Sequence, residues 1–157
     1  MKIKKVYNYG MRNYDSELEF SFKLLIKTAL NSDVSHKHAS ALLHKDIILS
    51  YGHNKLTNSL GTFSIHAEID AITAGLYSLK KKNNKFKSVD IIVIRLNKKG
   101  HFTNSRPCSF CIQKLQELKI RKVYYSNQYG NIICEFIESM EKTHISMGDK
   151  NLNKLLK

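Results

Sequence analysis

The amino-acid sequence predicts an α/β protein, a three-layer α/β/α domain with a mixed sheet of about five strands. Amphipathic helical segments alternate with strand-like segments, and one of the strand-like segments is apolar throughout. The 157 residues are enough for one domain with a real core. No internal repeat or linker divides them, so we expect a single domain over 1–157. Its core spans about 16–140, between a basic N-terminal arm at 1–14 and a polar C-terminal tail at 140–157.

The first half of the chain is expected to form a helix and then a β-hairpin. Residues 16–31 carry apolar side chains at helical spacing on one face, namely Leu18, Phe22, Leu25 and Ala29. Residues 38–54 hold two short apolar runs around a turn at 44–46, a pattern typical of a hairpin. A polar loop over 55–62 leads to the next helix.

The second half is expected to add two helices and three strands. A helical stripe starts at Ile65 and includes Ile69, Ile72, Leu76 and Leu79. The apolar run 88–97 is typical of a central strand covered on both faces. Residues 107–120 predict a third helix, with Pro107 in its first turn, and 121–126 and 132–138 predict a final strand pair.

Charge leaves the question of a nucleic-acid partner open. The net charge is +13, which can attract nucleic acid or phosphorylated ligands through a non-specific field. However, 22 of the 26 basic residues are lysine, and arginine, the usual reader of bases and phosphates, is scarce. The N-terminus lacks the apolar stretch of a signal peptide, and no apolar run approaches the roughly 20 residues that span a bilayer. We therefore expect an intracellular, cytoplasmic protein.

The three cysteines favour metal binding or redox chemistry over a disulfide framework. Their number is odd, and Cys108 and Cys111 form a Cys-x-x-Cys motif. By itself this motif also fits a redox pair or half of a structural zinc site. Cys134 lies in a strand-like run, where a core cysteine is the simpler interpretation.

His66, Cys108 and Cys111 are three suitable zinc ligands at the starts of two predicted helices. A catalytic zinc site keeps its fourth position open for water, whose pKa it lowers to about 7; His101 is an alternative fourth ligand. Glu68, two residues after His66, would not bind the metal and is placed to carry protons. We therefore expect one Zn²⁺ per chain, with water or hydroxide in the fourth position.

The pattern His66-Ala67-Glu68 followed by Pro107-Cys108-x-x-Cys111 resembles the zinc-dependent deaminases of cytidine, deoxycytidylate and tRNA adenosine. The resemblance covers about residues 36–137 and implies a cytidine-deaminase-like fold. It also implies that His66, Cys108 and Cys111 hold zinc and that Glu68 is the catalytic proton carrier.

The same resemblance implies four substrate contacts. The backbone of Ala67 would contact the exocyclic oxygen of the pyrimidine. A carbonyl near Ser105 or Arg106 would accept a hydrogen bond from the leaving amine, and Asn54, in a Gly-x-Asn pattern, would hold the ribose.

Three functions follow from these expectations. The first is a hydrolytic deaminase of a cytosine nucleoside or nucleotide, where Lys55 and Arg106 could pair with a 5′-phosphate. The expected terminal hairpin resembles the cytidine-deaminase arrangement. The second is an enzyme that edits cytosine or adenosine in single-stranded nucleic acid or tRNA, with Tyr51, His53 and Phe102 as stacking surfaces. The third is a non-catalytic, zinc-stabilised binding protein. The superfamily resemblance also implies a homo-oligomer, a dimer or a tetramer.

Overall fold

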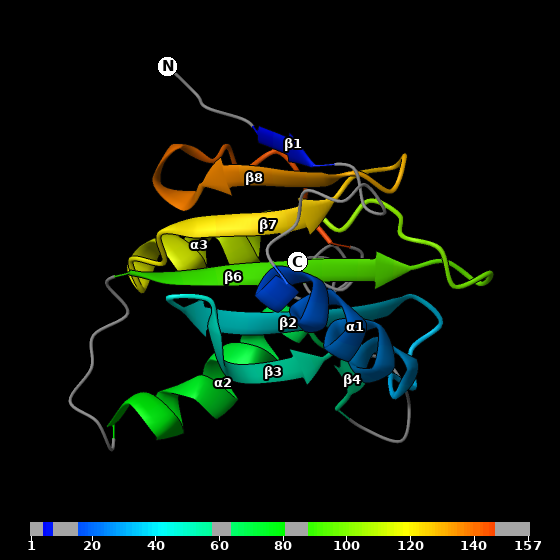
Figure 1. Cartoon of the computed structure of the whole chain (residues 1–157), viewed down its shortest axis with the longest axis horizontal. Helices are drawn as coiled ribbons and strands as arrows, with labels where there is room; N and C mark the ends of the chain where they lie inside the picture. Colours follow the sequence, from blue (N-terminus) through cyan, green and yellow to red (C-terminus); the bar gives the residue numbers. More distant parts are fainter. Residues whose placement is uncertain (1–4, 8–15, 58–63, 81–87, 147–157) are drawn as a thin grey trace, which may run out of the picture.

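A six-stranded mixed sheet forms the middle layer of the computed structural model, which describes residues 5–7, 16–57, 64–80 and 88–146. The strand order is β1-β8-β7-β6-β2-β3 (Figure 1). The strands are β1 (Lys5–Tyr7), β2 (Lys37–His44), β3 (Ile47–His53), β6 (Val89–Leu96), β7 (Lys122–Ser126) and β8 (Ile132–Phe136). Within the described part of the chain, β6 and β7 are the one parallel pair. The predicted α/β class with a mixed sheet is confirmed.

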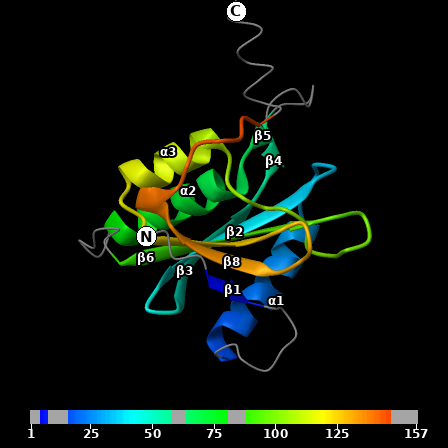
Figure 2. The same cartoon turned by 90° about the horizontal axis from the view of Figure 1, so that it is seen from above.

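Three helices cover the two faces of this sheet and complete the predicted layers. Helix α1 (Ser16–Leu30) lies on one face, and α2 (Ala67–Lys80) and α3 (Ser109–Glu117) lie on the other (Figure 2). The apolar face expected for α1 is buried, because Phe22, Leu25 and Ala29 are fully inaccessible to solvent.

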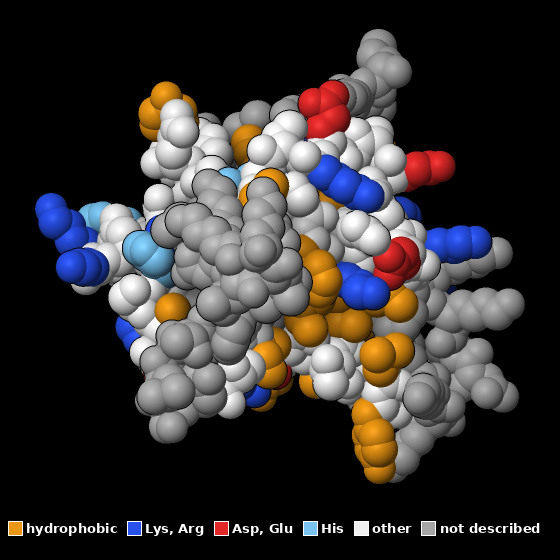
Figure 3. All heavy atoms as spheres, turned by 180° about the vertical axis from the view of Figure 1, so that it is seen from behind, with side chains coloured by type: hydrophobic (Ala, Val, Ile, Leu, Met, Phe, Trp, Pro, Cys, Tyr) orange, Lys and Arg blue, Asp and Glu red, His pale blue; other side chains and the backbone are white. Residues whose placement is uncertain are grey.

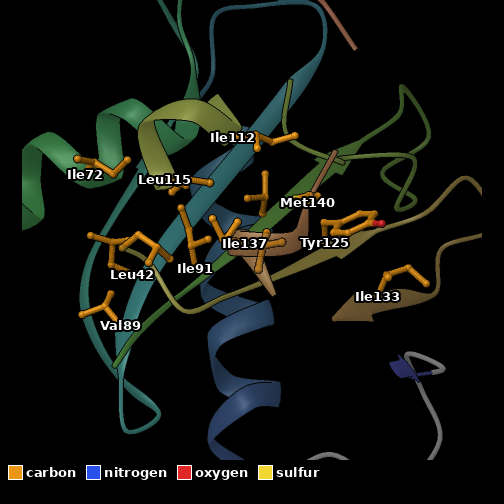
Figure 4. Packing of buried hydrophobic residues seen from close by; sticks show 13 residues of the cluster. Leu42, Ile72, Val89, Ile91, Ile112, Leu115, Tyr125, Ile133, Ile137 and Met140 are labelled. Atoms are coloured by element: carbon orange, nitrogen blue, oxygen red, sulfur yellow. The ribbon is translucent and has the colours of Figure 1, made fainter. Parts of the chain in front are cut away.

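The apolar run of β6 is explained by two separate cores. Ile91 and Val93 pack under α2 and α3 with residues such as Ile72 and Leu115 (Figure 4). Ile92 and Ile94, which point to the opposite face, pack under α1. Because successive strand residues alternate between faces, a strand with helices on both sides must be apolar at nearly every position.

The predicted hairpin turn is present between β2 and β3. Lys45 and Asp46 both have positive φ angles, 48° and 66°. Two such residues in succession give the two-residue turn whose twist matches that of the flanking strands. The hairpin brings the ends of the pair, near His38 and His53, together at one edge of the fold.

Four segments differ from the expectations. Residues Lys5–Tyr7, expected in a loose arm, form β1 and pair with β8. Ile65, expected in a helix, lies in β5 (Ser64–Ile65), which pairs with β4 (Lys55–Leu56). Pro107 precedes α3, which begins at Ser109 with Cys108 as its N-cap residue.

The fourth difference is at the end of the chain, where a short 3₁₀ helix (Ile137–Ser139) replaces the end of the expected strand. The segment 140–146 then continues without regular structure, and the rest of the predicted tail, 147–157, lies outside the described residues. In the part of the chain that the structure describes, no helix is long and apolar enough to cross a membrane.

Candidate active site and metal centre

Two helix N-termini bring one imidazole and two thiols together. His66 immediately precedes α2, Cys108 is the N-cap residue of α3, and Cys111 lies in the first turn of α3. Their ligand atoms all lie within 4.8 Å of one another. His66 Nδ1 is 3.3 Å from the sulfur of Cys111 and 3.5 Å from that of Cys108. A tetrahedral zinc ion with ordinary bond lengths would separate such atoms by about 3.6 Å, so the donor set fits zinc in both chemistry and spacing.

The first turn of α2 is fastened to the end of β3. The carboxylate of Asp70 accepts a hydrogen bond from the backbone N–H of His53 (3.1 Å) and pairs with Lys55 (2.9 Å). At the next residue, the hydroxyl of Ser50 donates to the carbonyl of Ala71 (2.7 Å). These contacts fix the position of His66 relative to the sheet. The sequence had suggested Lys55 as a phosphate ligand, but its ammonium group is paired with the carboxylate of Asp70.

The environment of Cys108 favours its thiolate form. A hydrogen bond from Cys111 is the largest effect, and together with nearby His66 it lowers the pKa of the Cys108 thiol to about 4, although burial acts in the opposite direction. A thiolate is the form of cysteine that binds metal ions. This thiol is therefore ready to bind a metal ion at neutral pH.

Glu68 is the buried carboxyl of the site. Its side chain is 4% exposed, and burial raises its pKa, while the positive charge of His66 opposes that rise. A carboxyl with a raised pKa binds a proton more readily than an exposed carboxyl, a property that suits general acid–base chemistry. Glu68 also lines the same cavity as His66 and Cys108.

The cavity beside the three donors has a volume of about 270 Å³. It lies where β6 and β7 end, the edge of a sheet at which ligands of open α/β proteins usually bind. Its lining includes residues from three distant parts of the chain, among them His36, Asn54, Arg95 and His144.

Asn54 is buried in the cavity wall and is largely engaged with the protein. Its amide oxygen accepts hydrogen bonds from the hydroxyl of Ser32 (2.7 Å) and the N–H of His38 (2.9 Å). Its amide nitrogen donates to the carbonyl of His36 (2.6 Å), which leaves one amide N–H for a ligand. Asn54 therefore also fixes the segment that carries both histidines.

At Ala67, Ser105 and Arg106, the other expected substrate contacts, the side chains are buried or hydrogen-bonded to other parts of the protein. Ala67 is fully buried at the start of α2. The hydroxyl of Ser105 donates to the carbonyl of Val93 (2.7 Å), so its side chain anchors the loop to β6. The guanidinium of Arg106 donates to the carbonyl of Glu141 (2.7 Å) and to Thr143 Oγ1 (3.2 Å), so it holds the segment 140–146.

His101 does not join the metal-binding donors. It is exposed, and its backbone is hydrogen-bonded to Asn97. The metal-binding cluster in the described residues is limited to His66, Cys108 and Cys111. Phe102, expected as a possible stacking surface, instead packs against Phe22 of α1, with 6.1 Å between ring centroids.

Four ionisable residues of the cavity lining were not found by sequence reasoning. His38 and Arg95 are direct cross-strand partners on β2 and β6, and His36 lies two residues before His38. His144 enters from the segment 140–146, where its carbonyl accepts hydrogen bonds from the N–H (2.6 Å) and hydroxyl (2.7 Å) of Ser109. A signal was present for Arg95, because it is the one arginine inside an otherwise apolar run.

A family model describing the cytidine and deoxycytidylate deaminase zinc-binding region matches residues 15–127, which is more than half of the chain. The chain belongs to this deaminase family. The matched region includes the three metal-binding donors and Glu68. A search of curated proteins found no significant match.

Solved structures of other deaminases share the fold. A cytidine deaminase from Burkholderia pseudomallei is 19% identical, with a TM-score of 0.54 over 78% of this chain and 98% of that one. A structure from work on A-to-I editing by tRNA:A34 deaminases is 20% identical, with a TM-score of 0.54 over 72% and 78% of the two chains. The dCMP deaminase of cyanophage S-TIM5, bound to dCMP and dUMP, is 19% identical, with a TM-score of 0.48 over 74% and 86%.

The arrangement supplies the groups that hydrolytic deamination requires. Two cysteines and a histidine can hold a metal ion at the cavity wall, and a buried carboxyl lies two residues from one of them. Backbone groups near Ala67 and Ser105 belong to the same part of the site. The cavity therefore combines three side chains that can hold a metal ion, a buried carboxyl and polar backbone around one volume.

Proposed function

We propose that this protein is a zinc-dependent hydrolytic deaminase that converts the cytosine of a nucleoside or nucleotide to uracil and releases ammonia. The observation that carries the proposal is the placement of buried Glu68 in one cavity with the His66, Cys108 and Cys111 donor set. The antiparallel β7–β8 hairpin also supports it, because this is the arrangement that the sequence resemblance associates with cytidine deaminases.

In this proposal, His66, Cys108 and Cys111 would hold a zinc ion, and a zinc ion held there would lower the pKa of a bound water to about 7. Glu68 takes one proton from the water that adds to C4 and delivers it to the ring nitrogen; it then takes the second proton from the new C4 hydroxyl and delivers it to the departing amine. A C4–O bond forms, the C4–N bond breaks, and ammonia leaves. The carbonyl of Ser105 or Arg106 would orient the amine, and the remaining N–H of Asn54 would contact the sugar.

Ammonia release from a substrate panel tests the proposal. The zinc-loaded protein is incubated with cytidine, deoxycytidine, CMP, dCMP, adenosine, guanine and short single-stranded DNA and RNA, with Glu68→Gln as the blank. Ammonia from a free cytosine compound supports the proposal. Conversion confined to oligonucleotides would instead show a nucleic-acid editor, and no ammonia from any compound would favour a non-catalytic zinc protein.

We also propose that the protein is a single domain and forms a homo-oligomer, a dimer or a tetramer, as the superfamily resemblance implies. Light scattering coupled to size-exclusion chromatography measures the mass of the assembly. A mass close to the 18.1 kDa of one chain would contradict the second of these proposals.

A further inference from the structure

Arg95 is a cation on the cavity wall that no carboxylate of the described residues neutralises. It lies near the end of β6, on the face covered by α2 and α3, and it lines the cavity. Its guanidinium makes one hydrogen-bond contact, 3.0 Å between Nη2 and Nδ1 of His36. Its Nε is buried without a hydrogen-bond partner. A guanidinium has five N–H donors, so several remain available, and leaving buried ones unpaired is costly.

The other cations near the cavity are already engaged. Lys55 pairs with Asp70, and Arg106 donates to the carbonyl of Glu141. Among the described residues that line the cavity, Glu68 carries the one carboxylate. Of the two arginines in this lining, Arg95 makes one guanidinium hydrogen bond and Arg106 makes two, so Arg95 has more donors left for a ligand. In Figure 3, pale-blue histidine side chains lie in the left part of the view. After the 180° turn from Figure 1, this is the side toward which β6 runs.

The position of His38 relates the arginine to the metal-binding donors. His38 is the cross-strand partner of Arg95, and both residues line the cavity together with His66 and Cys108. The arginine and two of the three metal-binding donors therefore line one cavity. Asn54, His36 and Arg95 line the same cavity as His66 and Cys108, so one ligand can reach both the donors and the arginine.

We propose that Arg95 and His36 bind the phosphate group of a nucleotide substrate, which makes the enzyme selective for a nucleoside monophosphate over the nucleoside. This inference rests on the proposed function and names its substrate class. Arginine suits the role because its planar fork matches two phosphate oxygens. The small volume of the cavity, about 270 Å³, favours a free nucleotide as the source of the phosphate. A phosphodiester in an oligonucleotide offers similar chemistry, and the experiment separates the two.

Binding measurements test the phosphate site without depending on turnover. Isothermal titration of the zinc-loaded Glu68→Gln protein compares dCMP, deoxycytidine and a short single-stranded oligonucleotide with one central cytosine. We expect dCMP to bind at least about 10-fold more tightly than deoxycytidine, as a charge-assisted hydrogen bond would give. In the Arg95→Gln background that preference should fall by about 10-fold, to near equal binding of the two ligands, and Arg95→Lys should restore part of it.

Two further variants keep the test decisive. His36→Ala changes an exposed residue, so it should fold normally and still reduce the preference for dCMP. Lys98→Gln removes one positive charge from the exposed loop after β6 and should leave the preference unchanged. Equal preferences in the parent, Arg95→Gln and His36→Ala proteins would overturn the proposal. Tighter binding of the oligonucleotide than of dCMP would also overturn it.

The inference and the proposed function fail in different ways. Binding of dCMP that depends on Arg95, without ammonia release by the Glu68 parent, would support the phosphate site and refute the deaminase. Ammonia release from deoxycytidine and dCMP with equal efficiency, unaffected by Arg95→Gln, would refute the phosphate site and support the deaminase.

Discussion

At the scale of single residues, Glu68 combines full burial with a position next to a metal-binding histidine. Replacing the Glu68 side chain should reduce turnover more than it reduces zinc binding. We expect Glu68→Gln to lower turnover by roughly 10²- to 10⁴-fold, the usual contribution of a general acid–base group, with zinc content unchanged. Ammonia release and atomic absorption measure the two quantities, and Glu138→Gln at an exposed site is the matched control. Parental turnover in Glu68→Gln would remove this residue from the mechanism.

His38 should make the stability of the protein depend on pH. Burial, the charge of Arg95, then those of His66 and His36 lower its pKa from 6.5 to about 3. Between these two values the unfolded chain binds a proton that the folded protein excludes, so the free energy of unfolding falls as the pH drops through this window. We expect His38→Gln to flatten this dependence between pH 7 and pH 5.

Urea denaturation of the metal-free protein at several pH values measures the effect, since metal release in acid would otherwise contribute. His101→Gln, at an exposed loop position, is the matched control. An identical decline of stability in the parent and His38→Gln proteins would contradict the assignment to His38.

At the scale of elements, the close approach of β3 to α2 fixes the position of the metal-binding histidine. A methyl group at Gly52 would lie 2.6 Å from both the backbone nitrogen of Ala71 and Oδ2 of Asp70. The helix must then move away from the sheet. We expect Gly52→Ala to destabilise the protein by about 1–3 kcal/mol, as overpacking does, and to lower zinc affinity.

Gly75→Ala is the natural control for that prediction. Its methyl group would meet only the side chains of Leu42 and Ser50, at 2.7 Å, which can adjust, and alanine is the better helix former. Thermal unfolding and zinc titration compare the two variants. Equal losses in both would show that the spacing between β3 and α2 does not control the site.

The segment 140–146 depends on Arg106 for its position. We expect Arg106→Ala to release this segment, because it removes two hydrogen bonds that join the loop before α3 to residues 141 and 143. Hydrogen exchange measured by mass spectrometry should then rise at 141–146. Lys142→Ala, in the same exposed segment, is the control. Unchanged exchange in Arg106→Ala would show that other contacts hold the segment.

The sequence predicts elements and the metal-binding donors more completely than it predicts the cavity. Helical and strand periodicity identify α1, the β2–β3 hairpin and β6, because each element has to bury its own apolar face. The proximity of His66, Cys108 and Cys111 can be predicted from short motifs at the starts of two helices. The proximity of His38 and Arg95 depends on the register between strands about fifty positions apart in sequence, which composition does not reveal. The polar segment 140–146 carries no periodic signal at all.

At the scale of the whole molecule, the metal-binding donors connect two helices that are far apart in sequence. Metal binding should therefore contribute to folding stability. With zinc at about 100 times its dissociation constant, the contribution is about 2.7 kcal/mol, and chelation should lower the melting temperature by roughly 5–10 °C. Calorimetry with and without a chelator measures this.

Variants of the cysteines separate the metal effect from packing. Cys111→Ala should lose zinc and show no further drop with chelator. Cys134→Ala, in β8 away from the cavity lining, should retain zinc. A full complement of zinc in Cys111→Ala would contradict the assignment of this residue as a ligand.

The cavity wall formed by His144 and Ser146 has a consequence for the order in which the protein is made. A new chain leaves the ribosome with its N-terminus first, so His66, Cys108 and Cys111 emerge before residues 141–146. A nascent chain can therefore take up its metal ion while one side of the cavity is still missing. The last described residues of the chain then complete that wall, with Arg106 already in place to receive them. The three donors therefore become available for metal binding before this wall of the cavity can form.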